Sequence, residues 1–292
     1  MNLDFTLTKY KELCETILDS GYSIYSLKAY FSLQNETEKF VIIRHDIDDE
    51  IDLINSLKIA EIESDLGIKA TYYFRTTNRV FKKDVIKKIA EMGHEIGYHY
   101  ETLGKTDGDI DLAFKLFIDE LENFRTLCPI KTIAQHGGPL KGDQSAASFS
   151  GLFNIIINLM FKTKNLDSWL SKDIWKQYNF ADLGILGEAY LSIDYNKIAY
   201  FTDTNRIWND PKYRMKDFAE GKSNINIVIN CTDDLIKIIK NKSVNKIVIT
   251  THPSNWKSNL AQWVSWLVLQ KIRNYGKKIL IMSNKSKSVK GS

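Results

Sequence analysis

The chain has 292 residues, of which 43% are hydrophobic, and this proportion excludes a largely disordered protein. Its 40 Lys and Arg residues and 36 Asp and Glu residues give a formal net charge of +4, which is too small to argue for nucleic-acid binding. The three cysteines, Cys14, Cys128 and Cys231, are too few and too widely spaced for a disulfide framework. They favour a reducing compartment.

The sequence shows no export signal and no membrane anchor. Residues 1–22 lack the apolar stretch of a secretory signal. The longest apolar run, residues 152–161, is interrupted by two asparagines and has about half the length that a transmembrane helix needs. We therefore expect a cytoplasmic protein without a transmembrane segment.

Short apolar runs alternate with helical patterns through the first half of the chain. The unit of strand, loop and helix recurs about every 25–35 residues, which is typical of a parallel α/β sheet. A first helix is predicted at residues 8–18. Strands are then predicted at 40–44, 69–74, 95–100 and 132–135, and helices at 51–66, 82–92 and 109–127.

The second half begins with residues 140–180, which show no clear period and are predicted to form an insertion with some helix. No linker rich in Pro, Gly or Ser follows, so we expect residues 1–292 to form a single domain. The strand pattern is predicted to return at 189–193, 197–202, 246–251 and 278–282, with helices at 233–240 and 260–275.

Four of the five histidines lie at or just beyond the carboxyl end of a predicted strand: His45, His99, His136 and His252. In parallel α/β folds, catalytic and binding residues gather at that edge of the sheet. A lone histidine is more often a hydrogen-bonded core residue, but four in this position favour a functional site.

Asp46 and Asp48 follow an apolar strand at alternate positions, so their side chains should point to the same side. Two such close carboxylates are stable together when a cation joins them. A divalent metal fits, with one carboxylate binding it and the other serving as a base. A helix N-cap is the alternative interpretation, but a cap accounts for only one Asp.

Three further patterns extend this candidate site. His99 and Glu101 share a strand face with Gly97, and His with carboxylate is common zinc ligation. His136 and His252 follow later strands, and histidine suits proton transfer near neutral pH.

Residues 200–208 combine acidic, basic and aromatic side chains after a predicted strand. Arg206 could clamp a carboxylate or phosphate, and Trp208 could stack on a sugar ring. Asp194 and Asp203 could orient a catalytic histidine. A surface hairpin with a salt bridge is the alternative.

The order of these motifs over residues 40–282 resembles the polysaccharide deacetylase superfamily, metal-dependent carbohydrate esterases that include chitooligosaccharide and peptidoglycan deacetylases. The resemblance implies a distorted (β/α) barrel with about seven parallel strands. It also implies that Asp46 is the catalytic base, that Asp48 and His99 bind the metal, and that His252 protonates the leaving amine. His136 falls where the third motif of the family lines the groove.

The chain departs from the family pattern at Leu103, where the second metal histidine is expected. Glu101 or His136 could supply the third ligand. We assign His136 to the metal and Glu101 to the catalytic group, and expect Arg44, Arg206 and Trp208 to bind substrate. The expected cofactor is a divalent metal, most simply zinc.

These motifs fit a divergent branch of the superfamily associated with surface polysaccharide biosynthesis. The expected activity is removal of an N-acyl group, acetyl or formyl, from an amino sugar that is nucleotide-linked, lipid-linked or part of an oligosaccharide. One alternative is a non-catalytic carbohydrate-binding or assembly protein on a degraded barrel, which Leu103 supports. Hydrolysis of an O-ester or a non-sugar amide is a second alternative.

Overall fold

The computed structural model describes residues 3–34, 37–137, 173–206, 208, 227, 229–269 and 271. The predicted insertion at 140–180 lies mostly outside these residues, and the predicted strand at 278–282 lies wholly outside them. Residues 260–269 are helical, which agrees with the first part of the helix predicted at 260–275.

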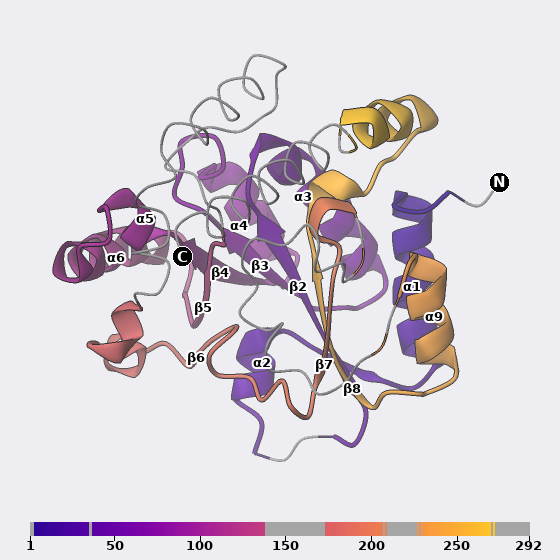
Figure 1. Cartoon of the computed structure of the whole chain (residues 1–292), viewed down its shortest axis with the longest axis horizontal. Coiled ribbons are helices and arrows are strands. Elements are labelled where there is room, and N and C mark those ends of the chain that lie inside the picture. The colour runs from indigo at the N-terminus through magenta and orange to yellow at the C-terminus, as the bar shows by residue number, and fades with distance from the viewer. Residues whose placement is uncertain are drawn as a thin grey trace, which may run out of the picture.

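The described strands form one curled parallel sheet, a half-barrel with helices around it (Figure 1). This confirms the predicted distorted α/β barrel. The strand order is β6-β5-β4-β3-β2-β8-β7, and β1 pairs with the first residues of β2. The strands are β1 (Ser23–Tyr25), β2 (Phe40–Ile47), β3 (Thr71–Phe74), β4 (Glu95–Tyr100), β5 (Thr132–Gln135), β6 (Gly187–Glu188), β7 (Ala199–Thr202) and β8 (Lys246–Thr251).

Helices cover the convex face of the sheet, with α1 and α9 side by side (Figure 1). The short helix α2 lies at the amino end of the strands, where its Leu27 and Lys28 amides donate to side chains of Thr71 and Glu95. The α-helices are α1 (Leu7–Asp19), α2 (Leu27–Phe31), α3 (Glu50–Asp65), α4 (Lys83–Glu91), α5 (Thr102–Lys105), α6 (Ile110–Arg125) and α9 (Thr232–Lys240).

Strand β2 is buried along its whole length because both of its faces are covered. Val41, Ile43 and Ile47 belong to the core between sheet and helices. Phe40 and Ile42, at the alternate positions, belong to a second core inside the curl. Side chains that follow on the inner face therefore reach the carboxyl edge from within the half-barrel.

The strand predicted at 189–193 is not present, and β6 ends at Glu188. The reason is local, because the Glu188 carboxylate accepts hydrogen bonds from the amides of Tyr190 and Leu191. Those amides are thereby taken up in a turn and do not join a ladder. Strand β1 and helices α2 and α5 were not predicted.

Candidate metal centre

The loop that follows β2 carries acidic residues with two separate tasks. Asp49 is the N-cap of α3, and its side chain accepts from the amides of Ile51 and Asp52. Asp52 completes the capping box and also accepts from the Asp48 amide, at 3.2 Å. The helix cap thus uses Asp49 and Asp52, which leaves the side chains of Asp46 and Asp48 for another purpose.

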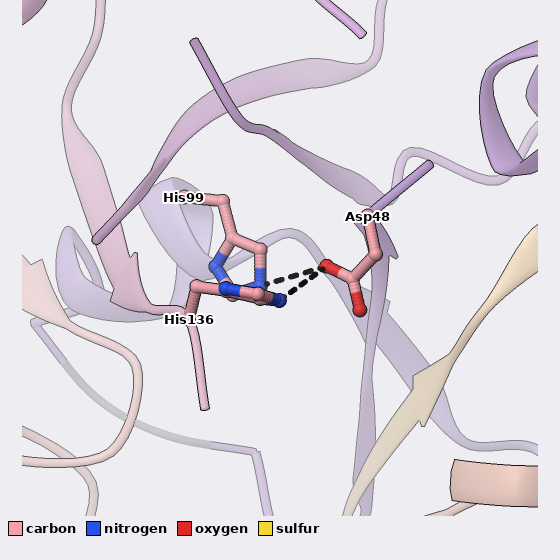
Figure 2. A group of neighbouring side chains, drawn as sticks. All are labelled: Asp48, His99 and His136. Atoms are coloured by element: carbon pink, nitrogen blue, oxygen red, sulfur yellow. Dashed lines mark ion pairs between the residues drawn. The ribbon is translucent and has the colours of Figure 1, made fainter. Parts of the chain in front are cut away.

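Asp48, His99 and His136 converge at the carboxyl edge of β2, β4 and β5 (Figure 2). The Oδ1 atom of Asp48 lies 3.3 Å from Nε2 of His99 and 3.5 Å from Nε2 of His136. One potential ligand atom of each residue lies within 4.8 Å of the others. These are the three residues predicted to bind the metal, and the structure brings them together.

The second nitrogen of each imidazole is directed at an oxygen atom away from this point. Nδ1 of His99 lies 3.0 Å from the Ala134 carbonyl, so the proton is assigned to Nδ1 and the lone pair to Nε2. Nδ1 of His136 lies 3.3 Å from Oε2 of Glu101, which favours the same tautomer. Protein zinc sites commonly orient their histidines in this way.

The three side chains fit a divalent cation. The Oδ1 atom of Asp48 is buried and has no hydrogen-bond partner in the structure, although two ring nitrogens face it. A carboxylate oxygen and two imidazole lone pairs repel one another unless a proton or a cation lies between them. Two histidines with one carboxylate form a known zinc donor set.

The charges around Asp48 keep it ionised. Burial alone would raise the pKa of Asp48, but the nearby His136 and His99 lower it well below its usual range. Burial lowers the pKa of His136, and this effect outweighs the opposing charge of Asp48. Burial alone would lower the pKa of His99, but Asp46 and Asp48 raise it, so binding of a metal at Nε2 would displace a proton from that ring.

Asp46 lies beside this triad on the inner face of β2, with Oδ2 at 3.8 Å from Nε2 of His99. The same oxygen accepts from Nη2 of Arg44 at 2.9 Å, and Oδ1 is buried without a hydrogen-bond partner. Arg44 is fully buried, also donates to the Tyr190 hydroxyl, and lies over the Tyr190 ring. The guanidinium of Arg44 thus already contacts Asp46 and Tyr190, and its predicted contact with substrate remains a prediction.

His252 faces the triad from the end of β8, with Nε2 at 3.7 Å from Oδ2 of Asp48. Its Nδ1 atom lies 2.7 Å from Oδ1 of Asp203, a carboxylate that the indole of Trp256 also holds at 2.9 Å. Burial alone would lower the pKa of His252, but Asp203, with Asp48 and Asp46, raises it to about 10. Of the two aspartates predicted to orient a histidine, Asp203 does so, whereas Asp194 lies in an exposed turn.

Glu101, a predicted catalytic residue, lies behind His136. Its two carboxylate oxygens accept from Nε and Nη2 of Arg75, at 3.2 and 2.6 Å. Leu103, where the resemblance would place a second metal histidine, is 3% exposed in the core between sheet and helices. The structure thus places His136 with the candidate ligands, whereas Glu101 contacts His136 and is not a member of the triad.

Arg206 and Trp208 lie apart from the triad. Trp208 is 2% exposed, stacks on Phe5 and donates from its indole to Thr232. Arg206 lies over the Trp263 ring and donates to the carbonyl of that residue. Trp208 is thus packed against Phe5 and Arg206 against Trp263, and their predicted contacts with substrate remain predictions.

His45 belongs to the other face of β2. Its Nε2 atom lies 2.9 Å from Oε1 of Glu63 on α3, and its Nδ1 atom lies 2.6 Å from the Thr251 hydroxyl. Glu63 also accepts from the hydroxyls of Tyr10 and Tyr72, both at 2.5 Å. Grouping His45 with the site histidines was therefore wrong, and its role is that of a hydrogen-bonded core residue.

Two residues that the sequence analysis missed support the site. Arg75 directly follows β3, and Tyr190 follows β6. Arg75 obeys the rule that identified the histidines, because it is a polar residue at the end of an apolar strand. Tyr190 carries no such signal, since tyrosine is as common in cores as in sites.

Comparison of the chain with protein-family models, with curated proteins and with solved structures found no match in any of the three. Among the residues that the structure describes, no helix is both long and apolar enough to cross a membrane.

Proposed function

We propose that the protein is a metal-dependent hydrolase that removes an N-acyl group from an amino sugar. The observation that carries this proposal is the arrangement around Asp48. Asp48, His99 and His136 form a possible metal triad. On one side lies Asp46, whose Oδ1 atom has no hydrogen-bond partner, and on the other lies His252, whose Nδ1 atom is 2.7 Å from the Asp203 carboxylate. Hydrolysis of an amide needs an acceptor for a proton of water and a donor to the departing nitrogen.

Asp48, His99 and His136 hold the metal in this proposal. When bound, a divalent cation such as zinc supplies Lewis acidity and makes water a better nucleophile. The Asp48 side chain is 29% exposed, whereas its Oδ1 atom, which faces the two histidines, is buried.

Asp46 serves as the proton acceptor. Arg44 engages its Oδ2 atom and fixes the rotamer, so Oδ1 is free to take a proton from the attacking water. The hydroxyl portion of that water bonds to the acyl carbon. A buried, prealigned carboxylate needs little reorganisation for this transfer.

His252 serves as the proton donor. Its raised pKa keeps the ring protonated near neutral pH, and Asp203 holds Nδ1 so that Nε2 faces the triad. When the C–N bond breaks, the Nε2 proton passes to nitrogen. The products are a carboxylate and the free amine of the sugar.

The choice of substrate is supported by the resemblance in motif order to the polysaccharide deacetylases. We propose on this basis that the reaction belongs to surface polysaccharide biosynthesis and acts on a nucleotide-linked, lipid-linked or oligomeric amino sugar. An acetyl or formyl group is the leaving acyl group, and zinc is the proposed ion.

The test is release of primary amine from N-acetylated and N-formylated sugars by the zinc-loaded full chain, with Asp46→Asn as the matched variant. We expect the wild type to release amine and Asp46→Asn to lose about 10²–10⁴-fold in rate while still binding zinc. Absence of amine release with binding of the intact sugar would instead support a non-catalytic carbohydrate-binding protein. Faster cleavage of matched O-acetyl sugars would favour an esterase.

A further inference from the structure

We propose that Arg75 and Glu101 form a positioning pair that orients His136 as the third metal ligand and fixes the loop that carries Asp48. This inference rests on the metal binding in the proposed function, but it concerns neither the substrate nor the hydrolytic step. It replaces the catalytic role predicted for Glu101 with a role exerted through His136.

The first observation is the place of Glu101. Its side chain is 8% exposed, and its Oε2 atom lies 3.3 Å from Nδ1 of His136, on the side of the ring opposite the triad. A carboxylate in this position favours the proton on Nδ1 and leaves the lone pair of Nε2 for a metal.

The second observation is the span of Arg75. Two of its nitrogens hold both oxygens of Glu101, and Nη1 donates to the main-chain carbonyl of Asp48 at 2.7 Å. One planar guanidinium thus connects the segment that carries Asp48 with the carboxylate behind His136. Lysine could not reproduce this because an ammonium group lacks the planar fork.

The third observation separates this role from direct ligation by Glu101. Both of its oxygens already accept from a charged donor, and such two-point pairs are strong. The carboxylate is therefore held by Arg75 on one side and faces the His136 ring on the other.

The position of His136 in the fold is the fourth observation. Leu103 lies in the core on α5, so no imidazole comes from that helix. His136 instead comes just after the end of β5, with a side chain that is 13% exposed. A ligand at the end of a strand needs a group that fixes its ring, and the Glu101 carboxylate, 3.3 Å from Nδ1, is placed to do so.

The experiment measures zinc affinity of the full chain by competition with a chromogenic chelator, for the wild type, Glu101→Gln and Arg75→Lys. Each variant is expected to weaken zinc binding about 10–100-fold. Glu122→Gln is the control, because Glu122 pairs with Arg125 at 3.1 Å, in an ion pair that shares no residue with Arg75 and Glu101. It is expected to bind zinc as the wild type does. Thermal melts of the apo proteins verify folding.

A second readout is independent of zinc. The ¹⁵N shifts of the His136 ring in the apo wild type should show the proton on Nδ1, and Glu101→Gln should shift the ring toward a mixture of tautomers. Unchanged zinc affinity and an unchanged tautomer in a folded Glu101→Gln or Arg75→Lys variant would overturn the proposal. Weakened zinc binding in these variants, with no amine released by the wild type, would uphold the pair and refute the hydrolase.

Discussion

Replacement of Glu63 by leucine should strongly lower the free energy of unfolding, because Glu63 is a buried hydrogen-bond acceptor on α3. The Glu63 carboxylate is fully buried and accepts from Tyr10, Tyr72 and His45 at 2.5, 2.5 and 2.9 Å. Leucine removes the acceptor and leaves three donors buried without partners. Removal of one partner from a buried charged network costs about 3–5 kcal/mol.

The assay is urea unfolding at pH 7, with Glu61→Leu as control. Glu61 lies on the same helix, but it is 53% exposed and pairs with Lys88 at 3.7 Å. Since Glu and Leu have similar helix propensities, both substitutions leave the intrinsic helix preference almost unchanged. We expect the control to stay within about 0.5 kcal/mol of the wild type. Equal, small losses in both variants would refute the assigned network.

The difference in stability between the wild type and Glu63→Leu should depend on pH, and its sign follows from the direction of the pKa shift of Glu63. Burial alone would raise the pKa of Glu63, but His45 holds it below its ordinary value of 4.5. The folded state therefore binds this proton less readily than the unfolded chain does. The stabilisation is fully present above the unfolded pKa and disappears as the pH falls through the folded pKa. The wild type and Glu63→Leu should thus converge in stability in acid, and a difference that grows below pH 4.5 would contradict the reasoning.

Three further substitutions test other parts of the molecule. Asp203→Asn should slow amide hydrolysis about 10²–10⁴-fold with zinc affinity unchanged, since it acts on His252; a loss of zinc instead would place Asp203 in the metal site. Trp208→Phe should lower the free energy of unfolding by about 1–3 kcal/mol without changing KM, whereas a raised KM would support its role in sugar binding. Gly97→Ala places a Cβ 2.3 Å from the Tyr73 ring and should cost about 1–3 kcal/mol, which thermal unfolding would detect.

Alternation along β2 was the most reliable guide to the site. The rule that places Asp46 and Asp48 on one side of the strand was sufficient to predict their meeting with His99. Applied to His45, the same rule puts that ring on the opposite face, where Glu63 holds it. The position of a histidine at the end of a strand was not enough to assign it to the site, because its side chain can point to either face of the sheet.

Other parts depend on contacts that local sequence does not show. Trp208 is a core residue because Phe5, at the other end of the chain, packs on it. Glu101 and His136 both reach the predicted edge, and only the contacts of Arg75, which directly follows β3, distinguish the role of Glu101 from that of a ligand. The chain turns after Glu188 because the Glu188 carboxylate accepts hydrogen bonds from the Tyr190 and Leu191 amides, which would otherwise pair with a neighbouring strand.

The most direct test of the metal centre is an anomalous difference map at the zinc edge, from crystals of the full chain grown with zinc. We predict a peak within about 2.0–2.2 Å of one oxygen of Asp48 and of Nε2 of both His99 and His136, and no peak there for Asp48→Ala. A peak elsewhere, or full occupancy in Asp48→Ala, would contradict the account.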